Sequence, residues 1–69
     1  HKCERIAAQY HLPPRTAEVL GMLAAGRGNK EIAEELCMGL NTVRTHVQNI
    51  YQKLDVHSRS DLASFIEQY

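Results

Sequence analysis

Side chains that can form hydrogen bonds with nucleic-acid bases recur between residues 40 and 54. At about 100° per residue of helix, these amide, hydroxyl and guanidinium groups fall on one side, which carries no acid. The members of this outer face are Asn41, Arg44, Thr45, Gln48, Asn49 and Gln52. Amides and guanidinium groups pair bidentately with adenine and guanine edges in the major groove of DNA. The pattern therefore predicts a helix that reads DNA.

An apolar stripe on the opposite side must hold this helix against the rest of the domain. The stripe consists of Val43, Val47, Ile50 and Leu54, which stack along one face of a helix. A second, shorter helix is predicted over residues 29–37, and residues 38–39 form a turn. A helix, a short turn and a longer polar-faced helix together predict a helix-turn-helix. In that unit the first helix crosses the DNA backbone and the second enters the groove.

Three further helices are predicted, over residues 2–10, 14–25 and 58–68. Two consecutive prolines end the first, and Pro14 can occupy the first turn of the second. Gly26 is expected to end the second helix. Ser58, followed three residues later by Asp61, resembles a capping box with aspartate in place of glutamate.

The chain is therefore predicted to be an all-α protein, since it shows no β-type alternation. Four helices are expected to form a helix-turn-helix bundle over residues 12–69. Residues 1–11 are expected to be either a connector or a short extra N-terminal helix. With 69 residues, this is one small domain, near the lower limit for a self-sufficient core. The chain begins at His1 without a methionine, so we expect it to be a piece of a longer protein.

The net charge of zero counts against nucleic-acid binding, because DNA-binding domains are often strongly basic. The distribution of charge partly restores that interpretation. Between Gly39 and Leu54 the only charged side chains are Arg44 and Lys53, with His46 between them. Overall neutrality predicts modest non-specific affinity, because few phosphates can be neutralised.

Composition and spacing argue against several other classes of function. The two cysteines are expected to be reduced thiols, and the four histidines form no pair with metal-ligand spacing, so no metal and no cofactor are predicted. No nucleophile–base constellation or phosphate loop is present, so an enzyme is not expected. No apolar run is long enough for a membrane span, and no signal peptide is visible.

The order and types of these residues resemble a known family, the LuxR-type (also called GerE-type) helix-turn-helix domain of bacterial transcriptional regulators. The resemblance covers residues 12–66. The matching pieces are LPPR with EVL, LAAG, NKEIAEEL, TVRTHVQNIYQKL and V-x-SR, in the order and spacing of the family. It implies a four-helix DNA-binding output domain that regulates transcription.

The resemblance also implies roles for particular residues. Base contacts are expected from Arg44, Thr45 and Gln48. Contacts with the DNA backbone are expected from Lys30, Asn41, Thr42, Lys53, Asn29 and His46. The last helix is expected to pair two domains on DNA, around Ser58, Leu62, Phe65 and Ile66.

The partners implied by the resemblance are double-stranded DNA, a second copy of the chain and an upstream sensor domain absent from this fragment. A response-regulator receiver is one such sensor. RNA polymerase is a further candidate partner for the acidic group Glu31, Glu34 and Glu35, which is otherwise expected to be a solvated face. The domain is expected in the cytoplasm, and the full-length protein could be anchored in a membrane through its N-terminal part.

Several positions depart from the family pattern. Pro13 replaces the usual threonine before the first proline, and Thr16-Ala17 replaces an acid-then-base pair. Gly28 and Gly39 replace the serines that open two of the helices, which should cost only a few tenths of a kcal/mol each. A more basic residue is common where Gln48 stands, so a different base preference is expected.

Two other interpretations remain open. One is a sigma-factor region that reads a promoter element through a similar helix-turn-helix. The other is an interaction module that kept the fold but lost DNA binding. At single residues, Lys30 could instead pair with Glu34 one turn later, and His46 could be packed rather than touching a phosphate.

Overall fold

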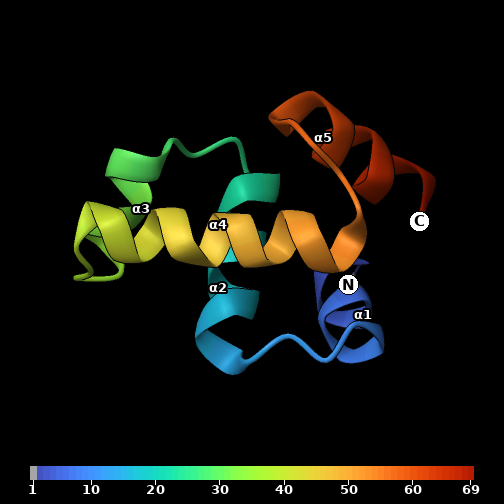
Figure 1. Cartoon of the computed structure of the whole chain (residues 1–69), viewed down its shortest axis with the longest axis horizontal. Coiled ribbons are helices and arrows are strands. Elements are labelled where there is room, and N and C mark those ends of the chain that lie inside the picture. Colours follow the sequence, from blue (N-terminus) through green and yellow to red (C-terminus); the bar gives the residue numbers. More distant parts are fainter. Residues whose placement is uncertain (1) are drawn as a thin grey trace.

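The computed structural model describes residues 2–69, and this range contains five helices and no strand (Figure 1). The helices are α1 (Lys2–Gln9), α2 (Pro14–Ala24), α3 (Asn29–Glu35), α4 (Leu40–Leu54) and α5 (Arg59–Gln68). The prediction of an all-α helix-turn-helix fold is confirmed, and residues 2–9 form an extra N-terminal helix. The predicted ends of the other helices differ from the structure by at most one residue, whereas α3 ends at Glu35 rather than at residue 37.

The apolar stripes of the helices meet in one core. α4 packs against α2 and α3, while α1 packs against α2. The side chains with the largest volume that are fully buried come from all five helices: Ile6, Leu20, Ile32, Ile50, Leu62, Val19 and Val43. A helix shorter than about 12 residues is marginal in water, so this shared burial is what keeps the short helices folded.

Four helices end in the same backbone reversal. The chain turns through a left-handed residue after each of α1 to α4, at His11, Gly26, Cys37 and Asp55 (φ 55°, 86°, 54° and 56°). In each case the next amide donates to a carbonyl five residues earlier, as Leu12 N does to Ala7 O (2.9 Å) and Met38 N to Ala33 O (2.9 Å). This is the Schellman motif, which usually places glycine at the left-handed position.

The reversal at Cys37 explains the early end of α3. Its left-handed backbone directs the chain from α3 into α4 within four residues, and so sets the relation of the two helices of the helix-turn-helix. Only Gly26 among the four left-handed positions is a glycine. The glycine therefore predicts the end of α2, whereas the cysteine gives no such signal for the end of α3.

α1 and α5 lie together at one end of the molecule (Figure 1). The rings of Tyr10 and Phe65 meet edge to face with centroids 5.8 Å apart. Lys2 Nζ donates to the carbonyl oxygen of Glu67 at 2.9 Å, and the Tyr69 hydroxyl is hydrogen-bonded to Gln9. Residues near the two ends of the chain are therefore joined by side-chain contacts.

Candidate nucleic-acid interface

The outer face of α4 is exposed, as the sequence predicts. α4 runs across the front of the molecule in Figure 1. All of its outer-face side chains are exposed: Asn41, Arg44, Thr45, Gln48, Asn49 and Gln52. The four residues of the apolar stripe are buried beneath them. The helix therefore presents hydrogen-bonding groups to the outside and uses only its inner face for packing.

The ends of α4 are fixed by local sequence. Gly39 precedes the helix in an extended conformation (φ −70°, ψ 153°), and Asp55 ends it in the left-handed region. No glycine or proline interrupts the fifteen residues between them. Lys53 lies in the last turn, where a cation interacts favourably with the helix dipole.

One member of the outer face is held by its own helix. The Thr45 hydroxyl donates to the carbonyl oxygen of Asn41 at 3.1 Å. Because this bond occupies the hydroxyl proton, Thr45 offers a partner its methyl group and its oxygen lone pairs. Such a side chain suits apolar contact with a thymine methyl more than donation to a base.

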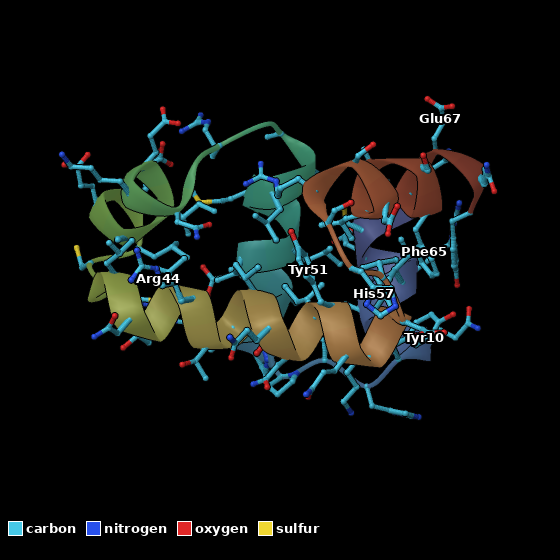
Figure 2. All side chains as sticks on the ribbon, turned by 45° about the horizontal axis from the view of Figure 1, so that its top comes forward. Tyr10, Arg44, Tyr51, His57, Phe65 and Glu67 are labelled. Carbon is cyan, nitrogen blue, oxygen red and sulfur yellow. The ribbon has the colours of Figure 1, made fainter. Side chains whose placement is uncertain are left out.

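Half of the cations in residues 2–69 have no intramolecular hydrogen bond or ion pair. They are Arg5, Lys30, Arg44 and Lys53. Three of these four, Lys30, Arg44 and Lys53, are among the residues for which the family resemblance implies DNA contact. Figure 2 shows Arg44 near the N-terminal end of α4, far from the aromatic pair Tyr10 and Phe65. The unengaged positive charge is therefore concentrated on and beside the helix-turn-helix.

The other four cations are engaged within the domain. They are Lys2, Arg15, Arg27 and Arg59. Arg15 lies 3.1 Å from Glu18, and a second guanidinium nitrogen donates to the carbonyl oxygen of Leu36 at 2.9 Å. Arg27 pairs with Glu35. The net charge of zero therefore conceals an uneven distribution of charge. Cations outside α4 are partly neutralised by acids, whereas α4 contains cations and no acid.

The start of α3 presents a free lysine. Lys30 is exposed, and residues 2–69 contain no ion pair between Lys30 and Glu34. Asn29, the first residue of the helix, is half-buried. Gly28 N donates to Glu31 Oε1 at 3.0 Å, so this acid caps its own helix. The structure therefore leaves Lys30 available to an external anion.

His46 joins α4 to α2. Its Nδ1 lies 3.0 Å from Thr16 Oγ1, and Thr16 is only 3% exposed. His46 itself is half-buried, and no other bond to its ring occurs within residues 2–69. The pair satisfies a buried hydroxyl and fixes the rotation of α4 on α2, which matches the packed interpretation of this histidine.

The last helix uses some of its predicted dimer residues internally. Ser58 Oγ accepts from Asp61 N at 3.0 Å, which confirms an N-cap, and Leu62 is only 2% exposed. Asp61 Oδ2 accepts from His57 N at 3.2 Å rather than from Ser58 N, so the capping box is displaced by one residue. Phe65 and Ile66 are half-buried against the core.

Residues 2–69 hold no group of three or more His, Cys, Asp or Glu side chains that could bind a metal ion. Burial raises the pKa of the Cys3 thiol, so it stays protonated at neutral pH and is a poor nucleophile. Cys37 is exposed, and neither thiol is in a disulfide. None of the described helices has the length and apolar character to cross a membrane.

Comparison with known proteins identifies the family. The family described as "Bacterial regulatory proteins, luxR family" matches residues 10–66. The chain belongs to the luxR family. The transcriptional regulatory protein LiaR of Bacillus subtilis (strain 168) is 42% identical over 65 residues, which are 94% of this chain and 31% of LiaR. The uncharacterized response regulatory protein YgeK of Escherichia coli (strain K12) is 45% identical over 64 residues, covering 87% of this chain and 44% of YgeK.

Membership defines the class of this domain. It is a helix-turn-helix DNA-binding domain of a transcriptional regulator and not an enzyme, as the sequence predicts. The chain spans less than half the length of either relative. The contacts assigned to individual side chains remain predictions, and the structure shows which of those side chains are exposed.

The structure of this luxR-family domain also adds residues that sequence reasoning did not assign. His11 and Pro13, from the connection between α1 and α2, line a groove together with Asn49, Gln52 and Lys53 of α4. Asn49 and Gln52 were expected on the outer face without a role. No sequence signal could place His11 there, because it is distant along the chain and only tertiary packing brings it to α4.

Proposed function

We propose that this domain binds duplex DNA sequence-specifically, with the outer face of α4 in the major groove. The observation that carries the proposal is the coincidence of two properties on one helix. The exposed face of α4 has no acid, and the two cations of α4 have no intramolecular partner among residues 2–69. Such a face matches the donors and acceptors of base edges and is attracted to the phosphates beside them.

The position of each residue along α4 supports its role. Arg44 and Thr45 lie in the half of α4 that begins at the turn, which is the half that reaches base edges in a helix-turn-helix, and Gln48 lies one helical turn after Arg44. Arg44 and Gln48 are assigned to bases, and Thr45 packs against them. Lys53 lies about 13 Å further along the axis than Arg44, so it is assigned to a phosphate.

The remaining assigned residues set the register of the domain on the DNA backbone. Lys30, Asn41 and Thr42 are exposed, with Lys30 in the first turn of α3 and Asn41 and Thr42 in the first turn of α4. Asn29 and His46 are half-buried, so each offers only part of its side chain. For His46 the bond to Thr16 supports a positioning role in addition to a phosphate contact.

Dimerisation through α5 and attachment to an upstream sensor complete the proposal. The response regulatory name of YgeK, and the length of both relatives outside the match, favour a sensor domain before this one. A dimer would place two α4 helices on paired half-sites, in the cytoplasm where the chromosome lies. Exposed acids such as Glu34 are the residues that we assign to contact with RNA polymerase.

Selection of bound sequences from a random pool of DNA duplexes tests the proposal. The expected result is a short enriched motif that occurs twice, at a separation of about one helical turn or a multiple of it. If no motif is enriched and the domain does not bind random duplex, the domain is instead an interaction module that has lost DNA binding. A single promoter-like element without repetition would favour the sigma-like interpretation.

A further inference from the structure

A groove lies beside the C-terminal half of α4. Among the residues that line it, only Lys53 has been assigned a DNA contact above. The connection between α1 and α2 forms one wall, since it runs alongside α4 (Figure 1). The groove has a volume of about 320 Å³. Its polar side chains are His11, Thr16, Asn49, Gln52 and Lys53.

The chemistry of this groove suits an anion. Lys53 is a cation without an intramolecular partner, while the amides of Asn49 and Gln52 and the imidazole of His11 can donate hydrogen bonds. No aspartate or glutamate lines the groove. The fifth polar group, the hydroxyl of Thr16, is occupied by His46. Each of the groups free to bind can therefore donate a hydrogen bond, and one of them carries a positive charge.

The backbone holds His11 in place. His11 lies at the left-handed position after α1 (φ 55°), and Leu12 N closes the reversal by donating to Ala7 O at 2.9 Å. Leu12 is buried in the core, and Pro13 and Pro14 restrict the chain after it. The exposed imidazole therefore projects from a rigid segment, so little backbone entropy would be lost on binding.

The groove continues the proposed DNA face. Asn49 and Gln52 belong both to the outer face of α4 and to the groove. If α4 lies in the major groove, the side of α4 that carries these residues and Lys53 faces the sugar-phosphate strand at the groove edge. An anion bound here would then be part of the duplex itself.

We propose that this groove holds one phosphate of the DNA backbone between Lys53 and His11, and that His11 is a DNA-contacting residue. The proposal rests on the proposed function, since it requires α4 to lie in the major groove. Lys53 supplies the charge, and His11 donates a hydrogen bond from the other wall. Such a contact fixes the register of the domain without reading sequence.

Neutralising single phosphates tests the proposal. A duplex selected from the random pool is prepared with one methylphosphonate at each backbone position in turn, and affinity is measured for each. We expect one position in each half-site at which the neutral group weakens binding of the unaltered domain. At that position the neutral group should have a much smaller effect on binding of His11→Gly and of Lys53→Ala. On unmodified duplex His11→Gly should bind about three- to tenfold more weakly to selected and random sequences alike. Lys53→Ala should reduce the slope of log affinity against log salt by about one.

Two features of the design keep the result interpretable. Glycine suits the left-handed backbone of position 11, so His11→Gly should fold, which thermal unfolding verifies. Arg5→Ala removes a partner-free cation of α1 outside the groove, and should leave the methylphosphonate pattern unchanged.

The outcomes separate this proposal from the proposed function. If the domain binds the selected duplex but His11→Gly keeps full affinity and the full methylphosphonate effect, the His11 contact is refuted and DNA binding stands. In a second outcome, inorganic phosphate shifts the NMR signals of His11, but His11→Gly does not change the methylphosphonate effect at any position. The groove then binds a free anion, and the proposal fails. If no duplex is bound, the proposed function itself fails.

Discussion

Arg44 combines exposure with the absence of any intramolecular partner in residues 2–69, so its guanidinium can form both hydrogen bonds with a guanine. We predict that Arg44→Ala weakens binding to the selected duplex by about 1–3 kcal/mol and changes binding to random duplex much less. Fluorescence anisotropy on both duplexes measures the difference. Equal losses on the two duplexes would make Arg44 a phosphate contact instead.

Cys37 occupies a left-handed backbone position where its Cβ is strained. We predict that Cys37→Gly raises the free energy of unfolding by about 0.5–1 kcal/mol, the relief of strain being partly offset by the greater freedom of glycine when unfolded. Cys37→Ala is the matched control, because it removes the thiol and keeps the Cβ. Urea unfolding that ranks the glycine variant no higher than the alanine variant would contradict the argument.

At the scale of elements, α5 has separate inner and outer faces. Leu62 is buried and Phe65 and Ile66 pack on the core, whereas Ala63 is exposed beside α2. We therefore expect pairing to use the exposed side of α5 that contains Ala63. This narrows the dimer prediction made from the sequence, which included Leu62 and Ser58.

We predict that Ala63→Glu abolishes complexes of two domains on one duplex, because it places a charge where two copies would have to exclude water. The unfolding temperature should change little, since Ala63 is exposed. Gel-shift stoichiometry measures the effect. Gln68→Glu adds the same charge at another exposed position of α5 and should leave the two-domain complex intact. Survival of that complex in Ala63→Glu would move the contact elsewhere.

For the whole molecule, α1 contributes to the core and to the connection between the two ends of the chain. Ile6 is fully buried, and Cys3 and Leu12 are buried beside it. The contacts of α1 with α5 also tie the first helix to the helix assigned to dimerisation. The first helix is therefore part of the folded core of this domain.

We predict that Ile6→Ala lowers the free energy of unfolding by about 2–5 kcal/mol, because it empties a filled core site. Arg5→Ala, on the exposed side of the same helix, should stay within about 0.5 kcal/mol. Thermal and urea unfolding of the two variants check the contrast. An Ile6→Ala domain as stable as the Arg5→Ala domain would mean that α1 does not pack on the core in solution.

The sequence by itself determined the helices, the apolar stripe and the exposed face of α4, because these follow from a helical repeat of about 3.6 residues. It also indicated the family, since the motifs occur in order. It extended α3 too far, because a left-handed turn at cysteine leaves no signal of the kind that glycine leaves at position 26.

Only the tertiary structure decided which charges are free and which residues share a surface. Arg15 and Lys30 look alike in the sequence, yet Arg15 is bound to Glu18 and to Leu36 O, while Lys30 is not engaged. The pairing of His46 with Thr16 and the shared groove of His11 and Lys53 join residues of separate helices and turns. Such contacts depend on how the helices pack, and the periodicity of one helix carries no information about the neighbour it will meet.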